Sequence, residues 1–167
     1  MAEVIPFRGI VYNQESIRNL AAVCTPPYDV ISPEEQEGFY AADPHNVIRL
    51  ILGRTSDSDT AADNRYTRAG RDYEAWRREG VLVQDEIPAF YLTTIDFDAA
   101  GRALKRYGLI ARVRLEPFEK GVVLPHETTF SKVKTDRFEL MKVCHANFSP
   151  IFSLYSDREN ILETLMA

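Results

Sequence analysis

Hydrophobic and polar residues recur along this chain with two different periods, which predict both helices and strands. Spacings of three and four predict an amphipathic helix over 61–79, and its apolar face comprises Tyr66, Ala69, Tyr73 and Trp76. Gly80 stands where the C-cap of that helix is expected. A second helix is expected from Pro33 to Ala42, because Ser32 and Glu35 have the spacing of a capping box and proline suits the first helical position.

Alternation with a period of two predicts a β-hairpin, with strands over 89–97 and 102–115 and Gly101 in the turn. Shorter strands are expected at 4–12, 45–52, 81–83, 122–124 and 151–155, and further helices from Thr135 or Asp136 and from Ser156 or Asp157. Strands and helices therefore interleave, while the hairpin is antiparallel. The sequence predicts an α/β fold, a mixed sheet with an antiparallel hairpin and packed helices.

The length of 167 residues, 45% of them hydrophobic, is enough for one full core, so we expect a single α/β domain over 1–167. The last helix runs to Ala167 without a glycine, proline or basic residue to end it. This ending predicts that the chain is a truncated N-terminal part of a longer protein.

Cysteine usage and the N-terminus predict a cytoplasmic protein. Cys24 and Cys144 have neither CxxC nor metal-ligand spacing, which is typical of reduced thiols. The N-terminus lacks the cationic flank and apolar run of a signal peptide. No segment approaches the roughly 20 apolar residues of a membrane span, so no membrane partner is expected. A pI of about 5.3 argues against a nucleic-acid partner.

The stretch 122–157 is the best candidate for a site, because it holds two of the three histidines and one of the two cysteines. Between 120 and 149, five basic and three acidic residues give a net charge of +2, against −5 for the chain. A polar loop before a helix exposes free N–H groups at the positive end of the helix dipole. The stretch therefore predicts a site for a small-molecule anion or metabolite, although the same charges also fit a solvated helix face.

Particular residues in and around this stretch suit particular roles. His126 and Glu127 can accept a proton and are the catalytic candidates. The expected anion-binding or phosphate-binding residues are Thr128, Ser131, Lys132, Lys134 and Arg137. The expected pocket wall comprises Tyr28, Asp29, Asn46, Arg49, Asn147 and Ser149. Five of these six wall residues also have a structural alternative: a proline-rich connector for Tyr28 and Asp29, a packed surface stem for Arg49, and a helix cap or turn for Asn147 and Ser149.

Three familiar chemistries are excluded by spacing. The segment HETTF lacks the second histidine of a HExxH zinc motif, so no metal site is expected. Cys144 and His145 are adjacent on a helix and do not face one another as a nucleophile and base would. GVVLP has none of the glycine pattern of a phosphate-binding loop.

Five segments, in the order PFRGIVYN, TPPYDVIS, PHNVIRL, LPHETTFSKVKTDRFEL and ANFSPIFSLYSD, resemble a bacterial and archaeal family. The family is called domain of unknown function one-thousand-and-fifteen, and the resemblance covers nearly the whole chain. Its longer members, about twice this length, carry a downstream Asp-Gly-His-His-Arg element that this chain lacks. That element is similar to the phosphate-contacting motif of ParB-like folds, including sulfiredoxin and the free-serine kinases.

The resemblance implies nucleotide-dependent phosphoryl transfer to a small hydroxylated metabolite such as an amino acid, with ATP or ADP bound by the full-length protein. In this interpretation Lys132, Lys134 and Arg137 neutralise the transferred group, and Glu127 or His126 acts as the base. A non-catalytic anion or metabolite sensor is the alternative. A nucleic-acid-binding module, suggested by the ParB-like relatives, ranks third. The sequence leaves the substrate, the nucleotide and the oligomeric state open.

Overall fold

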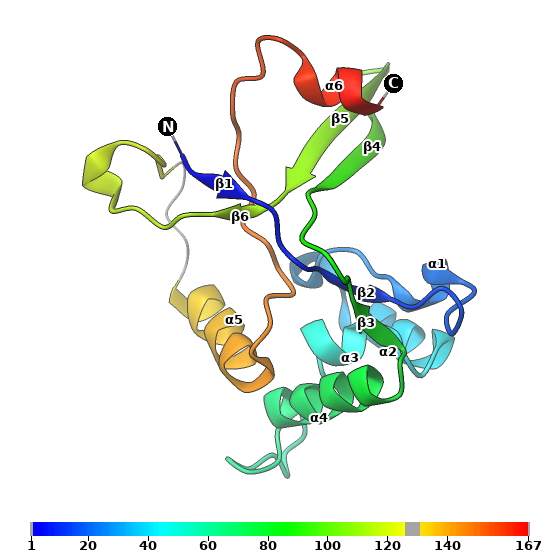
Figure 1. Ribbon diagram of the computed structural model, residues 1–167. Helices are drawn as coiled ribbons and strands as arrows, with labels where there is room; N and C mark the ends of the chain where they lie inside the picture. The colour runs from blue at the N-terminus through cyan, green and yellow to red at the C-terminus, as the bar shows by residue number, and fades with distance from the viewer. Residues whose placement is uncertain (1, 126–130, 167) are drawn as a thin grey trace. The chain divides into compact units, whose positions relative to one another are not determined.

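The computed structural model of the protein describes residues 2–125 and 131–166, apart from the side chains of 131–133 (Figure 1). It confirms the predicted α/β class, with an antiparallel hairpin and packed helices. The chain forms two compact units. The first takes the described residues of 1–9, 85–128 and 150–167, and the second those of 10–84 and 129–149.

The second unit is mainly helical and holds the hydrophobic core. Its two strands, β2 (Ile10–Tyr12) and β3 (Leu82–Gln84), pair antiparallel with Val11 opposite Val83. Its helices are α1 (Leu20–Val23), the 3₁₀ helix η1 (Tyr28–Val30), α2 (Pro33–Ala42), α3 (Ile48–Ile51), α4 (Arg65–Arg78) and α5 (Ser131–Cys144).

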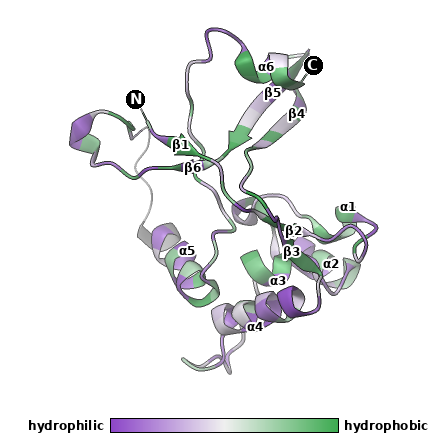
Figure 2. Ribbon diagram, in the orientation of Figure 1, coloured by the Kyte–Doolittle hydropathy of each residue, from purple (hydrophilic) through white to green (hydrophobic). Residues whose placement is uncertain are grey.

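The core forms where α3, α4 and α5 bring their apolar sides together with β3. Figure 2 shows α3 largely in the hydrophobic colour, and three of its four residues are buried. The predicted apolar face of α4 is confirmed, since its most buried residues include Ala69, Tyr73 and Trp76. Burying a large aliphatic side chain stabilises a fold by about 1.5–3 kcal/mol. The core cluster comprises Ile17, Val23, Leu50, Ile51, Ala69, Tyr73, Trp76, Val81, Leu82, Leu140 and Cys144.

The ends of α2 and α4 follow from local sequence. Ser32 accepts a hydrogen bond from the Glu35 backbone N–H while the Glu35 carboxylate accepts one from Ser32, so the predicted capping box is confirmed. Asn64 and Thr67 make the same reciprocal bonds at the start of α4. Gly80 has a φ of +73°, a left-handed conformation that glycine adopts without strain just after a helix.

The first unit contains the predicted hairpin. Strands β4 (Tyr91–Ala99) and β5 (Arg102–Ile110) pair antiparallel over their whole length, with Ile95 opposite Arg106. Ala100 and Gly101 form a two-residue turn with φ angles of 50° and 73°, as a type I′ turn requires. The other elements of this unit are β1 (Val4–Ile5), which pairs with β6 (Arg112–Val113), the 3₁₀ helix η2 (Phe118–Lys120) and α6 (Ile161–Met166).

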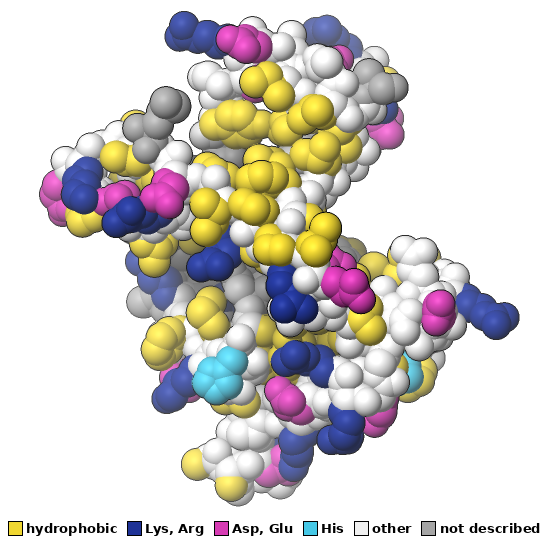
Figure 3. Space-filling model, in the orientation of Figure 1, with side chains coloured by type: hydrophobic (Ala, Val, Ile, Leu, Met, Phe, Trp, Pro, Cys, Tyr) yellow, Lys and Arg dark blue, Asp and Glu magenta, His cyan; other side chains and the backbone are white. Residues whose placement is uncertain are grey.

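Large hydrophobic side chains of the first unit remain exposed. Among the described residues of this unit, Leu162 on α6 is the buried hydrophobic residue, with an exposure of 8%. In contrast, Leu115, Ile151 and Leu154 are each at least 85% exposed. Figure 3 shows hydrophobic side chains gathered over the region of β4, β5 and α6. This unit therefore buries much less apolar surface than the second.

Three expected strands are absent. The segment 45–52, expected as a strand, contains α3, because Asp43 and Asn46 accept hydrogen bonds from the backbone N–H groups of His45 and Ile48 and begin a helical turn. The expected strands at 122–124 and 151–155 are not strands in the structure. The helix expected from Thr135 or Asp136 begins earlier, at Ser131. Within the described part of the chain, no helix combines the length and apolar character needed to span a bilayer.

Candidate functional site

The densest polar network in the second unit centres on Asp136 and Arg137, near the start of α5. The Asp136 carboxylate accepts hydrogen bonds through Oδ1 from the Tyr66 hydroxyl at 2.7 Å and from Nη2 of Arg65. Its Oδ2 accepts from Nε of Arg137 at 2.8 Å and from Nη2 of the same guanidinium. Two helices, α4 and α5, are thereby joined by one carboxylate. We call Tyr28, Arg65, Tyr66, Asp136 and Arg137 the Arg137 cluster.

Two further contacts fix the Arg137 guanidinium. Its Nη2 donates a hydrogen bond to the backbone carbonyl of Ile51, at the end of α3, at 2.8 Å. Its Cζ lies 3.8 Å from the centre of the Tyr28 ring, in the geometry of a cation–π contact. Tyr28 is held there by η1, which follows Pro27. The proline-rich loop thus places an aromatic ring against the guanidinium, although Tyr28 is not among the residues that line the small cavity that Arg137 lines.

One nitrogen of Arg137 has no hydrogen-bond partner among the described residues. Nη1 is buried and unpaired, whereas Nε and Nη2 donate to Asp136 and Ile51. A guanidinium carries five N–H donors, two of them on each terminal nitrogen. Both N–H groups of Nη1 are therefore available to a further acceptor.

A small cavity of about 10 Å³, room for one water-sized group, has Arg137 among its lining residues. Besides Arg137, its polar lining residues are Asn147 and Ser149, and its apolar lining residues are Leu140, Met141, Ala146 and Phe148. The Asn147 Oδ1 accepts from the Ser149 backbone N–H at 3.0 Å, which forms the turn expected after α5. Among the described residues, Arg137 is the charged member of the lining, and its guanidinium is paired with the Asp136 carboxylate.

Hydrogen bonding keeps Asp136 ionised. Burial alone would raise the pKa of its carboxyl group, but hydrogen bonds from Tyr66 and Arg137 and the charges of Arg137 and Arg65 lower it below the ordinary value of 3.8. Two guanidinium groups thus contact one carboxylate. The side chains of Arg65, Arg137 and Asp136 are 27%, 17% and 15% exposed, respectively. Because two positive charges contact one negative charge, the cluster keeps one positive charge in partly buried surroundings.

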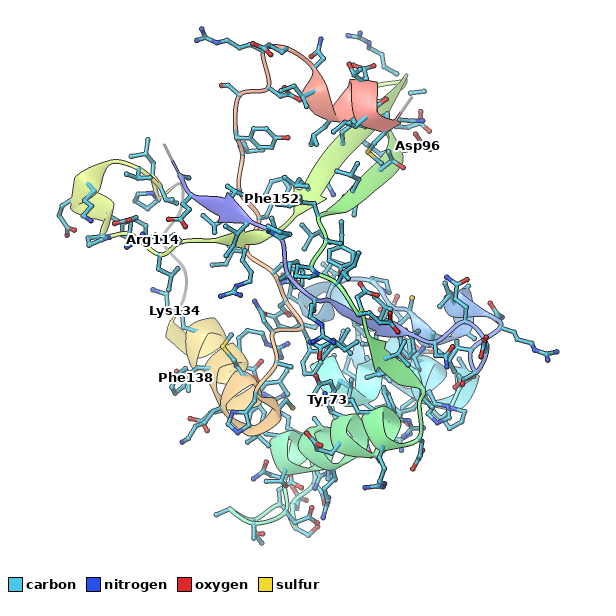
Figure 4. All side chains as sticks on the ribbon, in the orientation of Figure 1. Tyr73, Asp96, Arg114, Lys134, Phe138 and Phe152 are labelled. Atoms are coloured by element: carbon cyan, nitrogen blue, oxygen red, sulfur yellow. The ribbon has the colours of Figure 1, made fainter. Side chains whose placement is uncertain are left out.

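Four of the predicted site residues come together here: Tyr28 and Arg137 are in contact, and Asn147 and Ser149 line the cavity beside Arg137. Lys134 lies exposed near the start of α5 (Figure 4). Asp29 follows Tyr28 in η1 and is exposed. Neither residue is among those that line the cavity.

Asn46 and Arg49 occupy other places in the second unit. Asn46 is fully buried and structural, because its amide donates to the Ala22 carbonyl at 2.8 Å and accepts from the Ile48 N–H at 2.9 Å. Arg49 donates to the Tyr40 carbonyl at 3.1 Å and lies 4.5 Å from the centre of the Tyr40 ring. Neither side chain is in the cavity lining.

The remaining candidates fall outside what the structure describes. His126, Glu127 and Thr128 are not among the described residues, and the side chains of Ser131 and Lys132 are not described either. Their catalytic and anion-binding roles stay predictions. Elsewhere, within the described residues, no three His, Cys, Asp or Glu side chains are grouped as metal ligands would be.

Sequence reasoning missed the partners of Arg137. Arg65 and Tyr66 lie at the start of α4, 71 and 70 positions before Asp136. The sequence pattern places Tyr66 on the apolar face of the helix, which agrees with the packing of its ring but does not predict the hydrogen bond that its hydroxyl donates to Asp136. A basic residue at the edge of an apolar helix face indicates that a carboxylate is needed nearby, but the local pattern does not say which one.

The fold and site together define an α/β protein with a half-buried arginine–aspartate cluster beside a small cavity. Residues 4–167 match the family described as Protein of unknown function (DUF1015), and the chain belongs to this family. The resemblance inferred from the five sequence segments is confirmed. No curated protein and no solved structure matches the chain.

Proposed function

We propose that the second unit binds a small anion at the Arg137 cluster. The observation that carries this proposal is the buried Nη1 of Arg137, which has two N–H donors and no partner among the described residues, in a side chain that lines a small cavity. A buried charged donor without a hydrogen bond destabilises a fold by about 1–3 kcal/mol. An oxyanion placed in the cavity removes that cost by accepting from Nη1.

Charge supports the same conclusion. Arg65 and Arg137 carry two positive charges, of which Asp136 neutralises one. Asn147 and Ser149, whose side chains carry neutral hydrogen-bond donors, also line the cavity. A single anion would therefore meet a net positive charge, a buried N–H pair and neutral donors in one place.

The test is a thermal-shift and calorimetric titration with acetate, inorganic phosphate and sulfate at constant ionic strength. At least one of these anions should raise the melting temperature of the wild-type protein, because a ligand at 100 times its Kd stabilises by about 2.7 kcal/mol. Arg137→Gln should abolish the effect. Arg78→Gln is the matched control, since Arg78 lies on α4 with its side chain 73% exposed.

Equal stabilisation of the wild type and the Arg137→Gln variant by every anion would contradict the proposal. Arg137 also holds the Ile51 carbonyl, so the variant needs a check of its fold by circular dichroism. Arg137→Lys serves as a second variant. It keeps the charge but loses the planar array of N–H donors, and it should bind the anion more weakly than the wild type.

For catalysis we propose nucleotide-dependent phosphoryl transfer to a small hydroxylated metabolite such as an amino acid. The support comes from sequence: the net charge of +2 between 120 and 149, and a base candidate in Glu127 or His126. With ATP and amino-acid acceptors such as serine, phosphorus NMR would detect the product. Loss of product in Glu127→Gln with unchanged anion affinity supports transfer. Anion binding without product in the wild-type protein supports a non-catalytic sensor instead.

A further inference from the structure

We infer that the anion bound at the Arg137 cluster is a carboxylate and not a phosphate, and that Asp136 sets this preference. The inference rests on the proposed function, because it names the ligand class of the same site. It depends on two properties of the cluster, namely which N–H donors remain and how much positive charge remains.

The remaining donors all lie on one nitrogen. Phosphate is commonly held by two nitrogens of an arginine, which donate parallel hydrogen bonds to two of its oxygens. Here the Nε–Nη2 edge of Arg137 is taken by Asp136, and Nη2 also donates to the Ile51 carbonyl. Within the described part of the chain, Nη1 is the nitrogen of Arg137 left for a ligand, and Arg137 lines a cavity of about 10 Å³. One oxygen atom fits there, which one end of a carboxylate supplies.

The remaining charge matches a monoanion. Among the charged groups that contact Arg137 or Asp136 within the described residues, Arg65, Arg137 and Asp136 sum to one positive charge. As far as the described residues go, the cavity lining adds no other charged residue. A carboxylate neutralises this charge. A phosphate carries about −1.5 to −2 at neutral pH, so it would leave negative charge beside the half-buried Asp136, which is unfavourable.

Asp136 therefore acts as a specificity-determining residue. It occupies the two-nitrogen edge of Arg137, and it cancels one of the two positive charges. Asp136→Asn would keep an amide oxygen that can accept from the Tyr66 hydroxyl, now at 2.7 Å from Oδ1. The substitution would leave the two positive charges of Arg65 and Arg137 without a negative partner in the cluster, and this net charge suits a dianion.

The experiment compares acetate with inorganic phosphate by isothermal calorimetry at pH 7.5 and constant ionic strength. The wild type should bind acetate about tenfold more tightly than phosphate. Asp136→Asn should reverse the order. Glu139→Gln is the matched control, because Glu139 lies on the same helix, changes the same charge and pairs only loosely with Lys142 at 3.9 Å. It should leave the order unchanged.

Arg65→Gln provides a second variant that does not alter the cavity lining. It should weaken phosphate binding more than acetate binding, because the cluster then has no net charge. If phosphate binds the wild type as tightly as acetate or more tightly, and Arg137→Gln abolishes this, the inference is wrong while the proposed anion site stands. If neither anion binds in an Arg137-dependent way, both fail. An unchanged order of affinities in a folded Asp136→Asn protein would also overturn the role of Asp136.

Discussion

Asp136 is the residue on which the polar interior of the second unit depends. Its carboxylate accepts hydrogen bonds from Arg65, Tyr66 and Arg137, and it is 15% exposed. Removing one member of such a group leaves the others without partners in a half-buried place. The contribution of the carboxylate is therefore larger than that of a surface ion pair, which is about 0–1 kcal/mol.

The lowered pKa of Asp136 predicts a pH dependence of stability. A carboxyl group with a lower pKa in the folded state stabilises the fold above its unfolded pKa, and this stabilisation is lost as the pH falls through the folded pKa. Above the ordinary value of 3.8, Asp136→Asn should lower the free energy of unfolding by about 2 kcal/mol. Below that value the difference between wild type and variant should shrink.

Urea unfolding of both proteins between neutral and acidic pH measures this difference. Glu139→Gln again serves as the control, because Glu139 lies on the same helix outside the cluster and makes one loose ion pair. A difference for Asp136→Asn that stays constant to the most acidic pH at which the protein folds would show that the ionised form of Asp136 has no special role.

At the scale of the elements, Gly70 determines how closely α4 and α5 pack. Glycine in a helix interior is less favourable than alanine by about 1 kcal/mol, so its place in the middle of α4 needs a reason. A Cβ atom at Gly70 would lie 2.7 Å from Cγ1 of Val143 on α5. The close approach of these helices is also what places Arg65 and Tyr66 beside Asp136.

We therefore expect Gly70→Ala to destabilise the protein by about 1–2 kcal/mol, because the steric clash outweighs the gain in helix propensity. The double variant Gly70→Ala, Val143→Ala should recover part of that loss. Gly38→Ala in α2 is the matched control: a Cβ there meets nothing within 4 Å, and the protein should gain up to about 1 kcal/mol. Thermal unfolding distinguishes these outcomes, and a stabilised Gly70→Ala protein would refute the packing argument.

The elements that were predicted correctly have strong local signals. The capping box at Ser32, the apolar spacing of 61–79 and the turn at Gly101 each identify an element from a few neighbouring residues. The predicted strand at 45–52 is wrong, because a short apolar run fits a helix or a strand equally well. There the hydrogen bonds of the Asp43 and Asn46 side chains decide in favour of a helical turn.

The candidate site is predictable from sequence only in part, because local patterns indicate some of its residues and not the contacts between distant segments. Proline stiffening indicated Tyr28, and charge and turn residues indicated Arg137, Asn147 and Ser149. Arg65 joins Asp136 across 71 residues of sequence. Such a contact follows from how α4 packs against α5, and that packing is a property of the whole core rather than of any segment.

At the scale of the molecule, the two units differ in how much apolar surface they bury. The core cluster lies entirely within the second unit. In the first, Ile95, Phe97 and Leu104 of the hairpin are 46%, 44% and 39% exposed. A two-stranded hairpin is marginally stable without further packing, so the hairpin should open more readily than the helices of the core.

Hydrogen exchange of the backbone amides tests this difference. Relative to the exchange rates of an unstructured chain, the amides of β4 and β5 should be protected less than those of α4 around Tyr73 and Trp76. Protection of the hairpin equal to that of α4 would show that its exposed apolar residues are covered in solution.

The two cysteines of this protein sit in opposite surroundings, and that contrast has a practical use. Cys144 is enclosed in the core at 3% exposure, and burial raises the pKa of its thiol to about 11, so it carries almost no reactive thiolate at neutral pH. Cys24 is exposed. A maleimide dye should therefore label the native protein at Cys24. The rate at which Cys144 takes up a second dye would then measure how often α5 separates from α4.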